Sequence, residues 1–217
     1  WQPVFGGDGF QAAFHPSDPN IFYFEYQNGY IGGTTDGGNF DSATDGLEYS
    51  DRRNWDMQYI FSHHDAGIMY TGTYRLYQSF GHLPTWVPIS EDLTDGDIFG
   101  ARYHTISTLD ESPLDPELVY VGTSDANVWR VNPFSQSKSN LSAGLPDRYV
   151  SSVKASPNNA NTVFVSHTGY KSNDFSPRIH RSDDQGNTWI PIAGDLPNLA
   201  INDLQILAGH QDSVIFA

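Results

Sequence analysis

The chain has 217 residues, of which 38% are hydrophobic, so it can bury a sizeable core. The formal net charge is −15, and a surface this acidic repels phosphate backbones and anionic lipids, which argues against nucleic acid and membrane surfaces as partners. Cysteine is absent, which excludes disulfides, thiolate metal sites and cysteine nucleophiles.

The remaining composition indicates strands and turns rather than helices. Aromatic residues are 5 Trp, 12 Tyr and 13 Phe, and turn-forming residues are 20 Gly and 13 Pro. No apolar run reaches the roughly 18 residues of a membrane span, so we expect no membrane insertion. The chain begins at Trp1 without a signal-peptide pattern, which indicates a mature product or a fragment.

Short apolar pairs recur along the chain after turn-rich stretches, and they indicate an internal repeat. Prolines with Asp or Asn stand in several of the preceding turns, as in 15–20, 112–117 and 156–161, and such residues favour corners between strands. The pairs lie 44 to 51 residues apart: Phe22-Tyr23, Met69-Tyr70, Val119-Tyr120, Val163-Phe164 and Val214-Ile215.

Each repeat is expected to hold four short strands, which in the fourth repeat fall at 151–155, 162–167, 178–182 and 189–192. Four strands in a unit of about 40 to 50 residues are typical of a β-propeller blade. The sequence therefore predicts an all-β propeller of four-stranded antiparallel blades. The whole chain is one domain, with units at 1–50, 51–100, 101–147, 148–200 and an incomplete 201–217.

About four and a half blades would leave apolar faces open at both ends of the array. Common propellers close with about six to eight blades. We therefore expect the chain to be part of a larger ring, or to be completed by another chain. A closed ring of four or five blades is the alternative.

Two segments 103 positions apart support the repeat. Residues 74–93 and 177–196 align without a gap and share eight of twenty residues. The second contains Ser182-Asp183-Asp184-Gln185-Gly186-Asn187-Thr188-Trp189, which resembles the Asp-box or BNR repeat of sialidases, sortilin-type receptors and several glycoside hydrolases. The resemblance implies that Ser182, Asp184, Gly186, Thr188 and Trp189 form a structural turn between the third and fourth strands of a blade.

Weaker copies of this pattern occur in two other units. Thr34, Asp36 and Gly38 precede Phe40 in the first unit. Ser79 precedes Thr85-Trp86 in the second, without the Asp and the Gly. The shared feature is a side chain that can bond to its own turn, followed by an aromatic residue that can pack between blades.

The N-terminus carries a second resemblance. The run from Trp1 to Phe10, followed by Pro16 and Ile21-Phe22-Tyr23, is similar to the opening blade of xyloglucan-degrading propeller hydrolases and of secreted bacterial proteins with sortilin-like repeats. In the hydrolases this blade carries a catalytic Asp in a Thr-Asp-Ile-Gly-Gly run. We place Gln27 at that position, and because a Gln cannot act as a general acid, this departure argues against the hydrolase mechanism.

Asp8 is the one catalytic candidate that the sequence offers. It stands in the run Gly6-Gly7-Asp8-Gly9, where a ligand can approach the backbone closely. The alternative is a tight turn or a closing strand. Glycoside hydrolysis needs two carboxyl groups about 5 to 9.5 Å apart, and no partner for Asp8 is assigned.

Two groups of residues have the composition of a metal site. Asp92, Asp95 and Asp97 surround Gly96 and offer oxygen ligands for Ca²⁺, although they do not match an EF-hand loop. His63-His64-Asp65 lies where other units place a turn, which favours a structural role. We otherwise predict no cofactor.

Exposed aromatic rings would allow stacking on sugars. The candidates are Tyr26, Tyr30, Tyr74, Tyr77 and Trp129. A sialidase is disfavoured, because such enzymes hold a carboxylate with clustered Arg side chains and only Arg52 and Arg53 are adjacent here.

Three functions remain from these observations. The first is a secreted or surface-attached propeller that binds a protein or a glycan on one face. The second is a xyloglucanase-like glycoside hydrolase that acts on β-glucans through an Asp pair. The third is a structural subunit of a larger surface assembly.

Overall fold

The computed structural model describes residues 6–81, 85–97 and 104–217. The described residues form four antiparallel sheets of four strands each and one two-stranded sheet. Their one helix is the single 3₁₀ turn η1 (Tyr170–Ser172), so nothing helical in these ranges has the length or apolarity needed to cross a membrane.

We call the sheets blades 1 to 5 in chain order. Blade 1 contains β1 (Ala12–Phe14), β2 (Phe22–Tyr26), β3 (Tyr30–Thr34) and β4 (Asp41–Ser42). Blade 2 contains β5 (Tyr59–Phe61), β6 (Ile68–Gly72), β7 (Leu76–Phe80) and β8 (Thr85–Pro88). Blade 3 contains β9 (Ile106–Glu111), β10 (Val119–Thr123), β11 (Val128–Val131) and β12 (Lys138–Asn140).

Blade 4 contains β13 (Tyr149–Ala155), β14 (Val163–Gly169), β15 (Asp174–Ser182) and β16 (Ile190–Pro191). Blade 5 holds the pair β17 (Gln205–Ile206) and β18 (Ile215–Phe216). In each complete blade, every strand pairs with the next one along the chain. The predicted all-β architecture of four-stranded antiparallel blades is confirmed.

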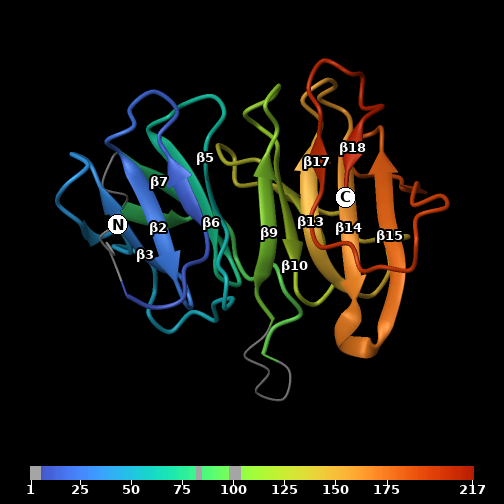
Figure 1. Cartoon of the computed structure of the whole chain (residues 1–217), viewed down its shortest axis with the longest axis horizontal. Coiled ribbons are helices and arrows are strands. Elements are labelled where there is room, and N and C mark those ends of the chain that lie inside the picture. The colour runs from blue at the N-terminus through green and yellow to red at the C-terminus, as the bar shows by residue number, and fades with distance from the viewer. Residues whose placement is uncertain (1–5, 82–84, 98–103) are drawn as a thin grey trace.

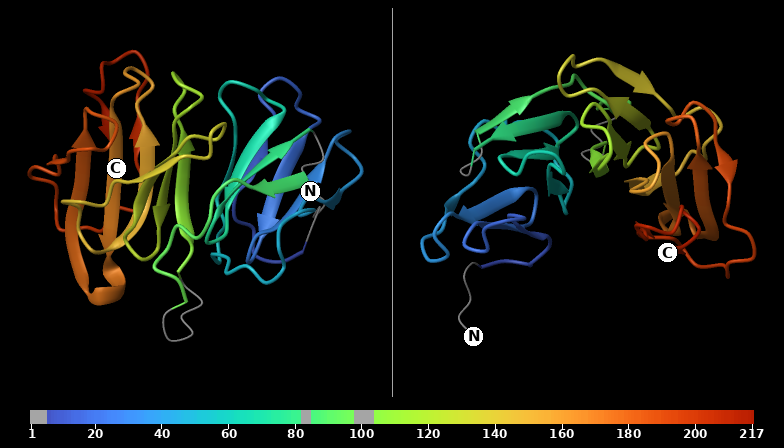
Figure 2. Two further views of the ribbon diagram at one scale, coloured as in Figure 1. Left: turned by 180° about the vertical axis from the view of Figure 1, so that it is seen from behind. Right: turned by 90° about the horizontal axis from the view of Figure 1, so that it is seen from above.

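The blades stand side by side and together form an arc. Seen from above in Figure 2, the sheets follow one another along a curve that leaves the concave side open, with blade 1 at one tip and blade 5 at the other. Figure 1 shows the same succession from β2 and β3 through β9 and β10 to β13–β15. The structure is therefore a partial ring.

Each blade presents apolar side chains to its neighbours because residues alternate between the two faces of a strand. In β2, Tyr23 and Glu25 are buried while Phe22, Phe24 and Tyr26 are only partly covered. Strands β10 and β14 lie between two neighbouring blades and are buried along their whole length.

The core consists of separate layers, one between each pair of consecutive blades. Tyr23 and Ile31 of blade 1 pack with Met69, Tyr77 and Trp86 of blade 2. The other three layers join blades 2 and 3, blades 3 and 4, and blades 4 and 5. This arrangement of units that pack mainly on their neighbours is typical of repeat proteins.

In each of the first three layers, one tryptophan joins the blades by a hydrogen bond as well as by packing. In every case the indole N–H donates to a backbone carbonyl of the preceding blade or of the segment just after it, which satisfies a group that would otherwise be buried unpaired. The pairs are Trp86 with Ala43 (2.8 Å), Trp129 with Leu93 (2.6 Å) and Trp189 with Leu141 (2.8 Å).

The outer face of blade 1 remains open. Phe14, Phe22, Phe24 and Phe40 lie together there, with ring centroids 5.2 to 6.5 Å apart along the cluster. Phe14 is 61% exposed. An apolar patch of this kind on a sheet face marks a surface that another element can cover.

Candidate functional site

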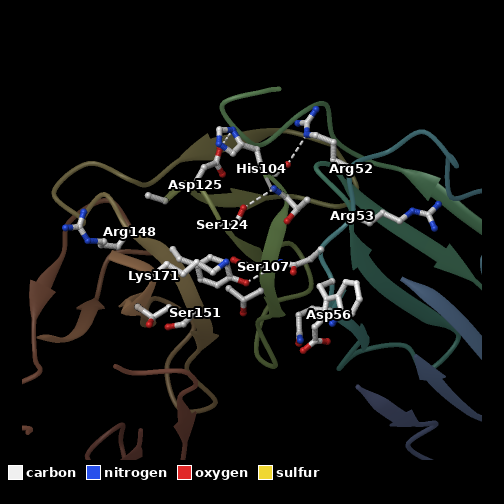
Figure 3. Close-up of a pocket in the computed structure, with 18 of the residues that line it drawn as sticks. Arg52, Arg53, Asp56, His104, Ser107, Ser124, Asp125, Arg148, Ser151 and Lys171 are labelled. Carbon is white, nitrogen blue, oxygen red and sulfur yellow. Dashed lines mark hydrogen bonds and ion pairs between the residues drawn. The ribbon is translucent and has the colours of Figure 1, made fainter. Parts of the chain in front are cut away.

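The concave side of the arc contains a cavity of about 1960 Å³. Its walls come from residues at the first strands of the blades, from the hairpins that follow their second strands, and from the connections between blades (Figure 3). Ser107 and Ser151 belong to first strands, Asn28 and Ser124 to hairpins, and Arg148 to a connection. The cavity is larger than the roughly 300–1,000 Å³ of a small-molecule pocket.

The connection between blades 1 and 2 lies across this cavity. Its Arg52 Nε donates to the carbonyl of His104 at 3.0 Å, and its Asn54 Nδ2 donates to the Tyr149 hydroxyl at 3.2 Å. The second bond joins residues 95 positions apart in the chain. The connection therefore contacts both blade 3 and blade 4 and forms part of the cavity wall.

Exposed aromatic rings stand at the blade 1 end of the cavity. Trp55 is 56% exposed and Tyr30 is 42% exposed, and both line the cavity. The ring of Tyr30 stacks on that of Tyr26 at a centroid distance of 5.1 Å and an interplanar angle of 12°. Rings with one covered and one open face can receive the apolar face of a ligand.

Most carboxylates of the lining are already engaged with the protein. Asp51 accepts two hydrogen bonds from Arg75 and one from the Tyr77 hydroxyl at 2.6 Å. Burial works to raise the pKa of Asp51, but these bonds outweigh it and hold the pKa below its ordinary value. Asp203 accepts a bond from Ser152 Oγ at 2.7 Å. These groups stabilise the wall.

Two further carboxyl groups near the blade 1 end have raised pKa values. Burial raises the pKa of Glu25 to about 7, against hydrogen bonds from the backbone N–H groups of Gly29 and Met57 that lower it. Burial also raises the pKa of Asp56, which lines the cavity. Glu25 itself is only 3% exposed, so a ligand in the cavity does not reach it.

The predicted stacking residues fall into two groups. Tyr26 and Tyr30 meet at the cavity as described. Tyr74 is half-buried with the Arg52 guanidinium 4.4 Å from its ring centre, and Trp129 is half-buried between blades 2 and 3. Tyr77 is fully buried and donates to Asp51, so the prediction that it stacks on a ligand is wrong.

Asp8 lies on the surface at the start of the described chain and outside the described lining of the cavity. Its carboxylate accepts a hydrogen bond from Gln27 Nε2 at 2.8 Å. The structure brings no second carboxyl group to it through a hydrogen bond. Residues 1–5, which carry part of the N-terminal resemblance, lie outside the described residues.

The alignment of Gln27 with the hydrolase Asp needs a correction. Ile31-Gly32-Gly33 follow Tyr30 in β3 and match the end of the Thr-Asp-Ile-Gly-Gly run without a gap. This match puts Tyr30, and not Gln27, in the place of the Asp. Neither residue carries a carboxyl group, so the departure from the hydrolase pattern stands.

The candidate metal ligands are engaged separately. The Asp92 carboxylate pairs with Arg52 at 2.8 Å, and Asp95 accepts a bond from Asn127 Nδ2 at 3.0 Å. His64 lies in the turn between β5 and β6, and its Nε2 is 2.8 Å from the carbonyl of Ser112 in blade 3. In residues 6–81, 85–97 and 104–217, no three His, Asp or Glu side chains gather closely enough to hold a metal ion. The predicted set of Asp92, Asp95 and Asp97 is therefore not assembled.

The turn from Ser182 to Trp189 is held by its own side chains. Ser182 Oγ accepts the N–H of Gly186 at 2.8 Å and donates to Asp184 Oδ1 at 2.7 Å. Asp184 in turn accepts the N–H and the hydroxyl of Thr188. Gly186 has φ +89°, and a Cβ there would meet Leu141, so glycine is required. The turn lies on the far side of its blade from the cavity lining.

Sequence reasoning missed the cationic part of the site. The chain has 11 Lys and Arg residues, and five of them line the cavity. Only two of the five are neighbours in the sequence, so the sequence contains no run of positive charge that would have indicated the site. The five are Arg52, Arg53, Arg148, Lys154 and Lys171.

No family model matches this sequence, and no curated protein matches it either. Solved structures do match. The GH74 enzyme of Niastella koreensis has 18% identity and a TM-score of 0.61, and the match covers 83% of this chain and 28% of that one. The GH74 xyloglucanase of Xanthomonas campestris has 16% identity and a TM-score of 0.64 over 90% of this chain and 33% of that one.

Structures of WD40 repeats match equally well. The WD40 repeats of RRP9 have 11% identity and a TM-score of 0.63, with 94% of this chain and 56% of that chain covered. The chain thus spans a third or less of the GH74 enzymes and somewhat more than half of the WD40 structure. Identities this low show the fold alone. Together with the succession of four-stranded sheets, they make this chain part of a blade-repeat β-propeller.

Proposed function

We propose that the chain is a binding propeller that holds a protein or a glycan in its concave cavity. The observation that carries this proposal is the cavity itself, which is wide and open, with exposed aromatic rings at one end. Its size suits an extended ligand better than a metabolite. Engaged carboxylates such as Asp51 and Asp203 favour binding over acid–base chemistry.

The test is a binding measurement with aromatic variants of the cavity. We expect Trp55→Ala and Tyr30→Ala to weaken the retention of the chain on immobilised polysaccharides or in a partner screen. Val87→Ala, on the outer strand β8 and 47% exposed, is the control that removes apolar surface elsewhere. Equal retention of all three variants would contradict the proposal.

The second candidate function is that of a glycoside hydrolase. The observation that favours it is the raised pKa of Asp56. Its raised pKa in the cavity wall is a property of general acids. The required partner carboxylate is not assigned, because Glu25 is buried and its Oε1 is held by two backbone N–H groups. Release of reducing sugar from β-glucans that disappears in Asp56→Asn would establish this candidate.

A structural subunit is the third candidate, and the open phenylalanine cluster of blade 1 favours it. Another chain that completes the ring would cover these rings. We expect a concentration-dependent increase in mass by light scattering that Phe14→Ser abolishes. A monomer at all concentrations would contradict this candidate.

We further assign Ser182–Trp189 to the Asp-box family, and we propose a secreted or surface-attached location. The support for the first is the closed hydrogen-bond pattern of Ser182, Asp184 and Thr188. The support for the second is the sequence resemblance to secreted sortilin-like propellers. Detection of the native protein in the culture medium or on the cell surface tests the location.

A further inference from the structure

The charge of the molecule is distributed unevenly. The cavity lining holds five of the 11 cationic residues but only five of the 26 acidic ones. The other acidic residues lie elsewhere, so the cavity is much less negative than the rest of the chain. Charges further away than about 8 Å are largely screened at physiological salt. An anionic ligand is therefore repelled least at the cavity.

The blade 4 side of the cavity carries an arginine that is only weakly paired with a carboxylate. Asp174 Oδ2 accepts Arg178 Nη2 at 2.6 Å and lies 3.5 Å from Arg148 Nε, so two guanidinium groups share one carboxylate. Arg148 Nε makes no hydrogen bond within the described residues. Hydrogen bonds from Arg178 and from Ser176 hold the pKa of Asp174 well below its ordinary value, so this carboxylate is ionised and already occupied.

A second cation stands beside this group. Lys171, in η1, is exposed, and its Nζ lies 5.4 Å from the centre of the Tyr149 ring. It forms no ion pair within the described residues. Asp147 precedes Arg148 in the sequence, and its backbone carbonyl accepts Arg148 Nη1 at 2.7 Å. Lys171 therefore has no carboxylate partner within the described residues, and Arg148 has only the 3.5 Å contact with the shared Asp174.

The same end carries an open aromatic ring. Tyr170 is 53% exposed and lines the cavity next to Lys171. An acidic sugar combines a carboxylate with the apolar face of a pyranose ring. Arg148 and Lys171 can bind the carboxylate through charge-assisted hydrogen bonds. The Tyr170 ring can pack against the apolar face of the pyranose.

We propose that Arg148, Lys171 and Tyr170 bind a uronate residue, and that the ligand of the cavity is an anionic, uronate-containing glycan. The inference rests on the proposed binding function and names its ligand class. Trp55 and Tyr30, which belong to the blade 1 end of the same lining, supply stacking surfaces for further sugar residues. An extended chain of sugars can contact both ends.

The experiment is calorimetric titration of the chain with oligogalacturonate and with a neutral xyloglucan oligosaccharide of the same length. We expect the acidic oligosaccharide to bind roughly tenfold tighter or more, the effect of one charge-assisted contact, and to weaken as salt is raised. The double variant Arg148→Gln/Lys171→Gln should lose this preference. In that variant Asp174 keeps its Arg178 partner.

The matched control is Lys138→Gln/Arg181→Gln. It also removes two cations, each with a carboxylate partner at 2.7 to 2.8 Å, on strands β12 and β15 outside the described lining. We expect its affinity for oligogalacturonate to stay within about twofold of the original chain, because screening limits the effect of distant charges.

The outcomes separate the two proposals. Equal binding of neutral and acidic oligosaccharides would overturn the uronate inference and leave the binding function standing. Competition by polyglutamate as strong as that by oligogalacturonate would overturn the sugar assignment. Binding to no polysaccharide, with capture of a protein partner through Trp55, would reject the glycan and support the protein form of the binding function.

Discussion

Blades 2 and 4 contain the aligned segments 74–93 and 177–196. Both pack a tryptophan against the preceding blade, but the turns that lead to the two tryptophans differ. In blade 4, Ser182 closes a turn through three hydrogen bonds. In blade 2, the equivalent Ser79 is buried and its Oγ has no partner within the described residues. Yet Trp86 and Trp189 both donate to a carbonyl of the preceding blade at 2.8 Å.

The difference teaches that the tryptophan contact and the turn are separable. Blade 2 lacks the Asp and the Gly of the blade 4 turn but keeps the indole contact between blades. The contact between neighbouring blades is therefore the more important of the two for the fold, and the turn is a local means of presenting it.

The largest expected effect comes from removing a tryptophan. Trp86 is 2% exposed whereas Trp189 is only partly buried. We expect Trp86→Ala to lower the free energy of unfolding by about 3–5 kcal/mol, and Trp189→Ala to lower it less. Urea denaturation measures both. A smaller loss for Trp86→Ala than for Trp189→Ala would break the comparison.

Replacing the two serines by alanine should have different effects on the free energy of unfolding. Ser182→Ala leaves the buried N–H of Gly186 without its acceptor, and we expect it to cost roughly 1–3 kcal/mol. Ser79→Ala removes a buried hydroxyl that bonds to none of the described residues, so we expect it to be neutral or stabilising. Equal losses in urea denaturation would show that Ser79 has a role like that of Ser182.

Blade 4 differs from blade 2 in its pH dependence as well. His167 is fully buried with both ring nitrogens unpartnered in the described residues, and burial, followed by the nearby His180 and Arg178, lowers its pKa to about 3. The equivalent Thr73 of blade 2 does not titrate and donates to Asp51.

Protonation of His167 therefore favours the unfolded chain. Below the ordinary histidine pKa of 6.5 the unfolded chain takes up a proton that the folded chain refuses, so stability falls as the pH drops from 6.5 toward 3. At pH 5.5 the loss of unfolding free energy is on the order of 1 kcal/mol. We expect His167→Leu to reduce this loss, as measured by urea denaturation at pH 5.5 and 7.5. An unchanged pH dependence would contradict the assignment.

The smallest effect isolates the indole hydrogen bond. We expect Trp189→Phe to keep most of the packing and to cost about 1 kcal/mol through the lost bond to Leu141. The loss should be similar in Trp129→Phe, whose indole bonds to Leu93. A neutral result for both would mean that packing alone joins the blades.

The fold was predictable because its signal is repeated. The apolar pairs, the Pro-containing turns and the aligned segments 74–93 and 177–196 each state the same local structure more than once. The strand expected at 162–167 is β14 (Val163–Gly169), and that at 178–182 lies within β15 (Asp174–Ser182).

The site was less predictable because its residues differ from blade to blade. Arg148, Lys171 and Trp55 line one cavity only because the blades follow a curve, and no spacing in the sequence encodes that curvature. Tyr77 was misassigned because a tyrosine on a strand looks the same whether its face is covered or open. The buried Glu25 gave no signal, since its pKa is raised by the packing of the next blade.

The connection between blades 1 and 2 has a mechanical consequence. An array of units that contact only their neighbours has no long-range contacts to resist bending. Here Asn54 bonds to Tyr149 and Arg52 bonds to His104. The connection between blades 1 and 2 therefore links parts of the arc that are not sequence neighbours. Widening the arc would stretch or break these two hydrogen bonds. The connection therefore opposes widening of the cavity, which lowers the cost of ordering the walls when a ligand binds.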